Sequence, residues 1–180
     1  MTNNQSSEII SNNHLKSSVL FNHLKSSVMN IVILENIRSA YNVGNIIRTA
    51  DALWWQVRLT WYTPSPIDTQ KVVKTSLGAE NTVGLQQFGH TSEAIEYAKK
   101  QWLLVIAAEI TNDSIPLALL QKDSHPGAAI IFWNEVDGVL DSTLQLVDKV
   151  VHIPMHGIKE SLNVGQTSAI FMRAGNQLYS

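Results

Sequence analysis

From residue 30 onward, short apolar runs alternate with segments of helical spacing. Residues 103–108 and 128–133 are continuously apolar, which is typical of strands covered on both faces. Another segment places Val43, Ile46 and Ile47 on one side of a helix. The pattern predicts strands at 30–34, 57–62, 83–88, 103–108, 128–133 and 150–153, and helices at 43–53, 71–77, 92–101 and 164–178. This alternation predicts an α/β domain with a mostly parallel sheet flanked by helices.

The first 29 residues differ in composition from the rest of the chain. They are rich in Asn and Ser, and a seven-residue sequence that begins at Asn13 recurs at Asn22. A nine-residue offset that occurs twice is too short for a solenoid repeat. We therefore expect a weakly structured polar arm at residues 1–29 and one domain at residues 30–180.

Composition excludes several classes of protein. The absence of cysteine excludes disulfides and thiolate metal sites. No apolar run approaches the length of about 20 residues that a membrane span needs, and the N-terminus lacks the compact apolar core of a secretion signal. We therefore expect a cytoplasmic protein without a membrane partner. The net charge of −2 gives no general attraction to nucleic acid, so such a partner would need a local basic patch.

Two familiar ligand patterns are also excluded by spacing. No two of the nine glycines are separated by a single residue, so the dinucleotide fingerprint Gly-x-Gly-x-x-Gly is impossible. His152 and His156 have the spacing of a helical zinc pair, but Pro154 lies between them and prevents a regular helix. We therefore expect no metal site.

Three polar segments interrupt the apolar pattern and are candidates for a site. The first follows the strand at 30–34, where Asn42 is a candidate helix cap and Gly44 permits close approach of another segment. It also places Arg48 in an otherwise apolar helix. Taken alone, Arg48 is most simply explained as a cation that extends to solvent or pairs with an acid such as Asp51.

The second polar segment ends the apolar run 128–133. Asn134 and Glu135 follow the run directly, and Gly138 marks a turn. Ligands collect at the ends of parallel strands in sheets of this kind. An equally simple explanation is a carboxylate of Glu135 that is satisfied by nearby backbone N–H groups.

The third segment is a turn-rich loop that leads into the final helix. Pro154 and Gly157 prevent a regular helix there. Ser161 and Asn163 lie where a helix N-cap is expected. A loop with free backbone groups beside a helix N-terminus is a candidate site for a polar ligand.

Together and in this order, the three segments resemble the motifs of the SpoU/TrmH family of RNA 2′-O-ribose methyltransferases, in the SPOUT class. The first matches Asn-x5-Arg with Val-Gly-Asn and Arg-Thr-Ala, and the second matches Asn-Glu-x-x-Gly. The third contains Ile-Pro-Met-x-Gly and Glu-Ser-Leu-Asn-Val. The likeness covers residues 30–178. Trp133 is a departure, because the family has glycine there, and an indole could narrow a cofactor pocket.

The resemblance implies an α/β fold with a C-terminal trefoil knot, a homodimer, and S-adenosylmethionine as cofactor. The implied cofactor-binding residues are Ala107, Ala108, Glu109, Trp133, Asn134, Gly138, Ile153, Met155, Ser161 and Leu162. The implied catalytic residues are Arg48, Asn42, Glu135, Ser161 and Asn163. Among these, Arg48 would grip a phosphate and stabilise charge on the reacting oxygen, and Asn42 would orient Arg48.

The implied reaction is methyl transfer to a ribose 2′-hydroxyl of tRNA or rRNA. We expect tRNA, because the arm is too small to be the extra RNA-binding domain of many ribosomal enzymes; Lys16 and Lys25 in the arm are further candidates for RNA contact. The alternative is a non-catalytic RNA-binding homolog whose cofactor pocket is narrowed by Trp133. Hydrophobic surface for the homodimer is expected from Trp54, Trp55 and the final helix.

Overall fold

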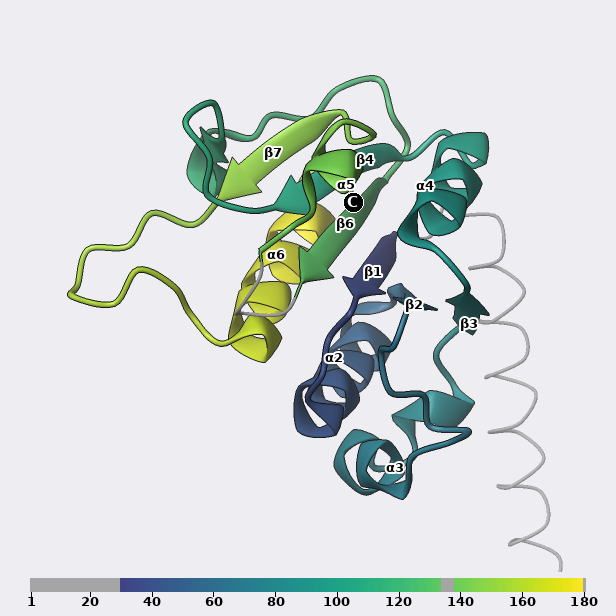
Figure 1. The fold of residues 1–180 in the computed structure, drawn as a ribbon. Helices are drawn as coiled ribbons and strands as arrows, with labels where there is room; N and C mark the ends of the chain where they lie inside the picture. The colour runs from purple at the N-terminus through teal and green to yellow at the C-terminus, as the bar shows by residue number, and fades with distance from the viewer. Residues whose placement is uncertain (1–29, 134–137, 180) are drawn as a thin grey trace, which may run out of the picture.

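The computed structural model describes residues 30–133 and 138–179; the predicted arm at residues 1–29 lies outside the described residues. Within these ranges seven strands form one sheet in the order β3-β2-β1-β6-β4-β7-β5, and all neighbours are parallel (Figure 1). The strands are β1 (Ile31–Glu35), β2 (Gln56–Thr60), β3 (Leu85–Phe88), β4 (Leu104–Ala108), β5 (Ile115–Pro116), β6 (Ala128–Trp133) and β7 (Lys149–His152). The helices are α2 (Ala40–Leu53), α3 (Gln70–Ser76), α4 (Thr91–Lys100), α5 (Asp141–Leu144) and α6 (Val164–Tyr179), with short 3-10 turns at Ala79–Asn81 and Leu117–Leu119. The predicted α/β fold with a mostly parallel sheet is confirmed.

Helices cover both faces of the sheet (Figure 1). Side chains alternate along a strand, so Val32 and Leu34 of β1 pack in one cluster with α2 and α6. Ile31 and Ile33 point to the opposite face and pack with Ala94 and neighbouring residues of α4. This two-sided burial explains why β1, β4 and β6 consist almost entirely of apolar residues.

The direction of the chain across the sheet reverses between β1 and β4. The chain first builds outward from β1 through β2 to β3, and then returns to form β4 on the other side of β1. Later, β6 fills the position between β1 and β4. The carboxyl ends of strands at such a reversal border the crevice where open α/β sheets bind ligands.

Several local predictions need correction. Helix α2 begins at Ala40, and its cap is Ser39, whose Oγ accepts from the backbone N–H of Asn42 at 3.3 Å. Asn42 is therefore inside the helix and is not its cap. The close approach predicted at Gly44 is confirmed, because a Cβ there would lie only 2.5 Å from the Cβ of Thr75 in α3.

The two adjacent tryptophans have different environments. Trp54 ends α2 and is 54% exposed, whereas Trp55 is 1% exposed. Trp55 Nε1 donates to Asn176 Oδ1 at 2.7 Å, and a Cβ on Gly175 would lie 2.6 Å from the indole. The expectation of exposed surface at both tryptophans is therefore wrong for Trp55, which joins α6 to the core.

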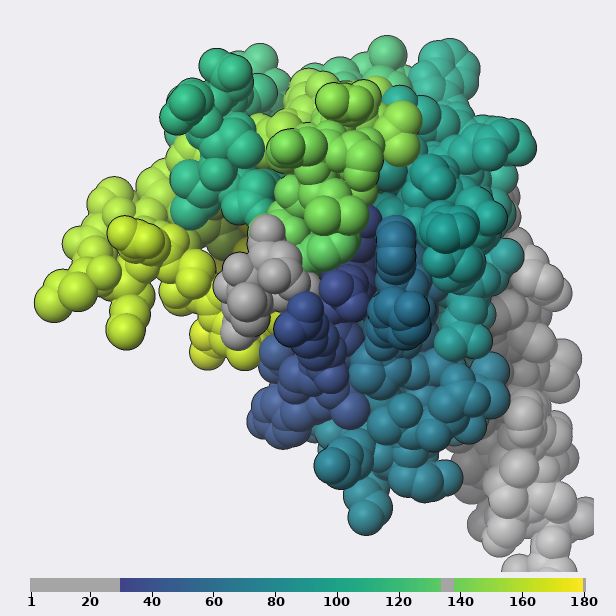
Figure 2. Space-filling model, in the orientation of Figure 1, coloured from purple at the N-terminus to yellow at the C-terminus, as the bar shows by residue number. Residues whose placement is uncertain are grey.

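The connection from β7 to α6 extends away from the body of the protein (Figures 1 and 2). Residues 156–161 are all exposed, and the side chain of Ile158 is 100% exposed. The backbone groups of this loop are consequently open to solvent or to a ligand. Of the helices within the described ranges, none is long and apolar enough to cross a membrane.

Candidate functional site

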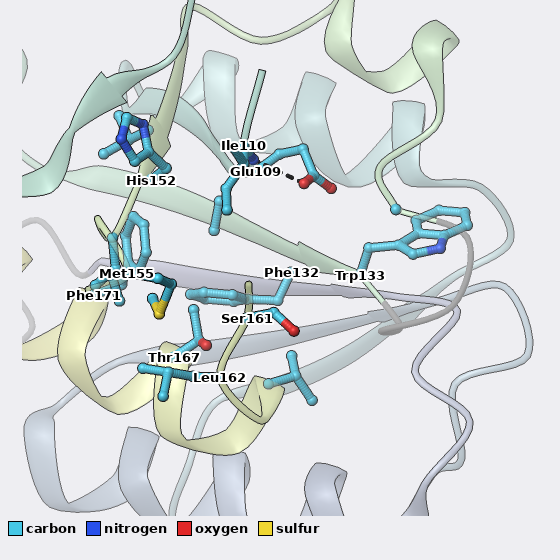
Figure 3. Close-up of a pocket in the computed structure, with 15 residues that line it drawn as sticks. Glu109, Ile110, Phe132, Trp133, His152, Met155, Ser161, Leu162, Thr167 and Phe171 are labelled. Atoms are coloured by element: carbon cyan, nitrogen blue, oxygen red, sulfur yellow. Dashed lines mark hydrogen bonds between the residues drawn. The ribbon is translucent and has the colours of Figure 1, made fainter. Parts of the chain in front are cut away.

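A hollow lies at the carboxyl ends of β4, β6 and β7, on the side where the final helix begins (Figure 3). It encloses about 160 Å³ and is open to solvent at its mouth. Eight of the predicted cofactor-binding residues line it, namely Ala108, Glu109, Trp133, Gly138, Ile153, Met155, Ser161 and Leu162. Ala107 does not line it, because this residue is fully buried against Trp133 and Val139. Asn134 and Glu135 lie outside the described residues.

Part of the wall comes from residues that sequence reasoning did not single out. Val164, Thr167 and Phe171 lie on one face of α6 and line the hollow. Their spacing of three and four residues is the signal that could have identified them. The rings of Phe171 and Phe132 meet edge to face with centroids 5.6 Å apart. These rings and Met155 gather on one side, as Figure 3 shows, and make that wall apolar.

Glu109 links the end of β4 to the segment that follows β6. Its Oε1 accepts from the backbone N–H of Ile110 at 2.8 Å, and its Oε2 accepts from that of Val139 at 3.0 Å. Gly138 has a φ of 70° and lies so close that a Cβ would be 3.2 Å from Glu109 Oε2. The positive φ therefore favours glycine here, and a Cβ would in addition crowd the Glu109 carboxylate.

Trp133 borders the hollow without filling it. Its indole is buried against Ala107 and Val139. Because β6 side chains alternate, this indole and the ring of Phe132 point to opposite faces of the sheet. Figure 3 shows the indole directed away from Met155. An indole in place of glycine therefore leaves the interior of the hollow open.

A buried carboxyl group lies beside Trp133 and was not predicted as part of the site. Glu35 pairs in register with Trp133, is 0% exposed, and accepts from Thr143 Oγ1 at 2.9 Å. Its Oε2 and Trp133 Nε1 are buried atoms for which no hydrogen-bond partner is found. Burial raises the pKa of Glu35, and hydrogen bonds from Thr91 and Thr143 oppose this rise only in part. The sequence signal that could have identified Glu35 is its position as an acid at the end of an apolar strand.

Substitution of Glu35 by Gln is expected to stabilise the protein at pH 8 and to change its stability little at pH 4. A carboxyl whose pKa is raised in the folded state stabilises fully below its ordinary pKa of 4.5, and this contribution is lost as pH rises through the raised pKa. Gln cannot ionise, so Glu35→Gln avoids that loss. Thermal melting should show a midpoint raised by a few degrees at pH 8 only.

The control is Glu160→Gln, because Glu160 is exposed and its melting midpoint should change little at either pH. An equal shift for Glu35→Gln at pH 4 and pH 8 would contradict the assignment of the effect to ionisation of Glu35.

Arg48 lies in a second groove, between α2 and α6. Its side chain is exposed and lines this groove together with Asn42 and Asn163. Asn163 Nδ2 donates to Asn42 Oδ1 at 3.2 Å. Asn163 Oδ1 also accepts from the N–H of Gly165 at 2.9 Å, which confirms Asn163 as the cap of α6. The structure thus brings Arg48, Asn42 and Asn163 together, while orientation of Arg48 by Asn42 stays a prediction.

One short segment joins the hollow and the groove. Ser161 and Leu162 line the hollow, and Asn163 lines the groove. The predicted catalytic and cofactor-binding residues therefore meet along residues 161–163.

The two histidines of the third motif do not form a helical pair. His152 ends β7, and its Nδ1 is 2.9 Å from Ser114 Oγ, whereas His156 is exposed in the loop. In the part of the chain that the structure describes, no group of three or more His, Asp or Glu side chains is placed to hold a metal ion.

The sequence is similar to those of several RNA methyltransferases. The chain is 29% identical over 142 residues to the 23S rRNA (guanosine-2'-O-)-methyltransferase RlmB of Vibrio vulnificus. It is 26% identical over 143 residues to the tRNA (guanosine(18)-2'-O)-methyltransferase of Escherichia coli. Each match covers 78% of this chain, which spans 56% and 60% of those two proteins. The tRNA (guanosine(18)-2'-O)-methyltransferase of Thermus thermophilus is 28% identical over 141 residues, and the match covers 78% of this chain and 71% of that protein.

Solved structures show the same fold. The AdoMet-bound rRNA methyltransferase from Sinorhizobium meliloti superposes with a TM-score of 0.75 at 23% identity, covering 83% of this chain and 56% of that chain. The Aquifex aeolicus TrmH/SpoU tRNA modifying enzyme superposes with a TM-score of 0.73 at 20% identity, covering 89% and 84%. The model of the SpoU rRNA Methylase family matches residues 29–173. Because this match spans most of the sequence, the chain belongs to the SpoU rRNA methylase family.

Proposed function

We propose that this protein acts in the cytoplasm and transfers a methyl group from S-adenosylmethionine to a ribose 2′-hydroxyl of RNA. The favoured substrate is tRNA, and rRNA is the alternative. The observation that carries the proposal is the junction at residues 161–163, where a hollow suited to a cofactor meets a groove that contains Arg48. Family membership and the names of the relatives support this reaction class.

The hollow has the chemistry that S-adenosylmethionine requires. Phe132, Met155 and Leu162 offer apolar contact for a flat ring, and Glu109 supplies a carboxylate for a cationic ligand. The enclosed 160 Å³ is below the ~300 Å³ that is usual at the lower end of small-molecule sites. Only part of such a ligand fits inside, so the rest would extend through the mouth beside the β7–α6 loop.

The chain's own residues have distinct tasks in the proposed reaction. Bound S-adenosylmethionine supplies an electrophilic methyl group. The segment at Ser161 and Asn163 positions the ribose between hollow and groove, which brings the reacting atoms together. Arg48 binds a phosphate of the RNA and stabilises negative charge that develops on the ribose oxygen. A guanidinium holds its proton too tightly to remove one from another group, so Arg48 acts as a cation and not as a base, and the proton of the ribose hydroxyl passes to solvent.

The alternative, a non-catalytic RNA-binding homolog, depends on obstruction by Trp133. The direction of its indole favours the enzyme. Isothermal titration calorimetry with S-adenosylmethionine separates the two: saturable binding supports the enzyme, and absence of binding at millimolar cofactor supports the binding module.

Replacement of Trp133 by Gly is expected to change the affinity for S-adenosylmethionine by less than about 2 kcal/mol, or roughly 30-fold. The reason is that the indole borders the hollow without filling it and packs against Ala107 and Val139. Calorimetry measures the affinity, and melting curves show whether the variant remains folded. Phe132→Ala is the matched comparison. The ring of Phe132 forms part of the wall of the hollow, so its removal should weaken the binding of S-adenosylmethionine more than Trp133→Gly does. Absence of binding by the wild type, together with its recovery in Trp133→Gly, would contradict the enzyme proposal.

We also propose a homodimer. Helices α2 and α6 expose Tyr41, Trp54 and Ile170, with exposed fractions of 66%, 54% and 42%. Burial of such side chains is a common source of association. Light scattering at micromolar concentration should give twice the mass of one chain, and a monomeric mass would contradict the proposal.

The C-terminal trefoil knot is a further part of the proposal. Its support is the place of the chain end: Tyr179 Oη donates to Asp123 Oδ1 at 3.3 Å, and Asp123 lies in the long β4–β6 connection. A helix end held against a distant connection is compatible with threading, although threaded chains are rare among proteins. Single-molecule stretching tests this, because a knotted chain has a shorter extended length than a free chain with the same number of residues.

A further inference from the structure

Two exposed aromatic residues follow β2 in a restricted backbone conformation. Trp61 is 45% exposed and Tyr62 is 85% exposed. The φ of Trp61 is 54°, a left-handed value that bulky residues rarely adopt. Trp54 and Trp102 have similar values, but they lie at the ends of helices. Trp61 instead stands at the end of a strand, where unusual backbone conformations often belong to a binding site.

Neighbouring segments fix this aromatic pair at the carboxyl edge of the sheet. Thr63 Oγ1 accepts from the N–H of Ile37 at 3.1 Å and donates to the carbonyl of Leu34 at 3.0 Å. These bonds tie the β2–α3 connection to the β1–α2 connection, and the two lie side by side in Figure 2. The indole of Trp61 also meets the ring of His90 edge to face, with centroids 5.4 Å apart. The pair is therefore held in place while much of its ring surface faces solvent.

We propose that Trp61 and Tyr62 form a surface on which unpaired bases of the substrate RNA stack. This inference rests on the proposed function and names one of its substrate contacts. The overall charge of −2 means that phosphate attraction alone is a weak basis for RNA binding. Stacking of bases on aromatic rings supplies affinity without depending on net charge, and it tolerates many sequences.

The surroundings of the pair favour RNA over a protein as the occupant. The exposed cations of the sequence from residue 36 to residue 75 are Arg38, Arg48, Lys71 and Lys74, against the exposed acids Asp51 and Asp68. Exposed cations thus outnumber exposed acids four to two within this stretch of sequence, on a chain that is negative overall. The exposed acid nearest to the Trp61–His90 contact is Glu93, whose Oε2 accepts from the backbone N–H of His90. Tyr41 is a further exposed aromatic residue: it is 66% exposed and lines the same groove as Arg48.

The test uses dodecaadenylate as the probe, with its affinity measured by fluorescence anisotropy of an end label. The double variant Trp61→Ala/Tyr62→Ala is expected to bind at least about tenfold more weakly than the wild type. Trp61→Tyr keeps a ring and should stay within about threefold. Trp102→Ala is the matched control: Trp102 is 65% exposed with a φ of 57°, but it precedes β4 at the opposite edge of the sheet. Its affinity should equal that of the wild type.

Three results would overturn the stacking surface. They are unchanged affinity in a folded Trp61→Ala/Tyr62→Ala variant, absence of probe binding by the wild type, and equal wild-type affinity for an abasic 12-mer of the same charge. If the double variant loses self-association but keeps probe affinity, the surface contacts protein and the proposal fails. Methyl transfer is measured in a separate assay. If probe binding depends on Trp61 but no methyl transfer is found, the proposed function is contradicted and the stacking surface is not.

Discussion

Replacement of Arg48 by Ala is expected to lower the rate of methyl transfer at least about 100-fold while leaving the fold intact. The side chain is exposed on α2, so its removal leaves no cavity in the core. Loss of a group that stabilises charge in a transition state typically lowers the rate by 10²–10³, or about 3–4 kcal/mol. Single-turnover rates with saturating S-adenosylmethionine measure the effect, and circular dichroism checks the fold.

The control for this experiment is Arg173→Ala. Arg173 is an exposed cation on α6 that lines neither the hollow nor the groove, so its variant should keep wild-type rates. Arg48→Lys tests geometry, because a lysine retains the charge but not the planar pair of donors. Activity of Arg48→Ala within about threefold of the wild type would remove Arg48 from the mechanism.

Replacement of Trp55 by Ala is expected to reduce the free energy of unfolding by about 3–5 kcal/mol. The buried indole contacts Gly175 closely, and its Nε1 donates to Asn176, so the variant loses both packing and a hydrogen bond between the α2–β2 connection and α6. Because domains are typically stable by only about 5–15 kcal/mol, this is a large fraction of the total. Urea denaturation measures the difference.

The adjacent residue provides the matched control. Trp54 has the same side chain and is 54% exposed, so Trp54→Ala should change the free energy of unfolding by less than about 1 kcal/mol. Equal losses in the two variants would contradict the description of Trp55 as the residue that joins α6 to the core.

The hydrophobic pattern correctly predicted most segments as helix or strand, because the buried residues of this fold follow the regular spacing of those elements. The apolar runs of β4 and β6 are covered on both faces, and the periodic residues of α2 face the core. Strands as short as β5 and helices as short as α5 left no usable period, and they were missed. The order of the strands could not be predicted from the hydrophobic pattern either, because the position of β6 between β1 and β4 depends on contacts between segments far apart in sequence.

Predictions from residue type alone were wrong where a contact with a distant part of the chain determines the structure. Ser39 and Asn42 are both good cap residues by type. Asn42 is inside the helix because Ser39 caps it, and its side chain instead bonds to Asn163, which is 121 positions away. Trp54 and Trp55 are chemically identical, and contacts of Trp55 with Gly175 and Asn176 in α6 distinguish them.

The candidate site depended more strongly on the family resemblance than on physical pattern. Pattern alone marked three polar segments but favoured a solvated or ion-paired cation as the explanation of Arg48. The resemblance supplied eight residues that line the hollow. It did not indicate the direction of the Trp133 indole or the buried carboxyl of Glu35, because both follow from this chain's own register between β1 and β6.

The central claim is ribose methylation of RNA, and mapping 2′-O-methylated nucleotides in total RNA tests it most directly. The map compares a wild-type strain, a strain that lacks the gene, and the deleted strain complemented with the wild-type or Arg48→Ala gene. Deletion is expected to remove at least one 2′-O-methyl group from tRNA or rRNA. The wild-type gene should restore this group, and the Arg48→Ala gene should leave it absent. Identical methylation of every tRNA and rRNA in all four strains would contradict the account.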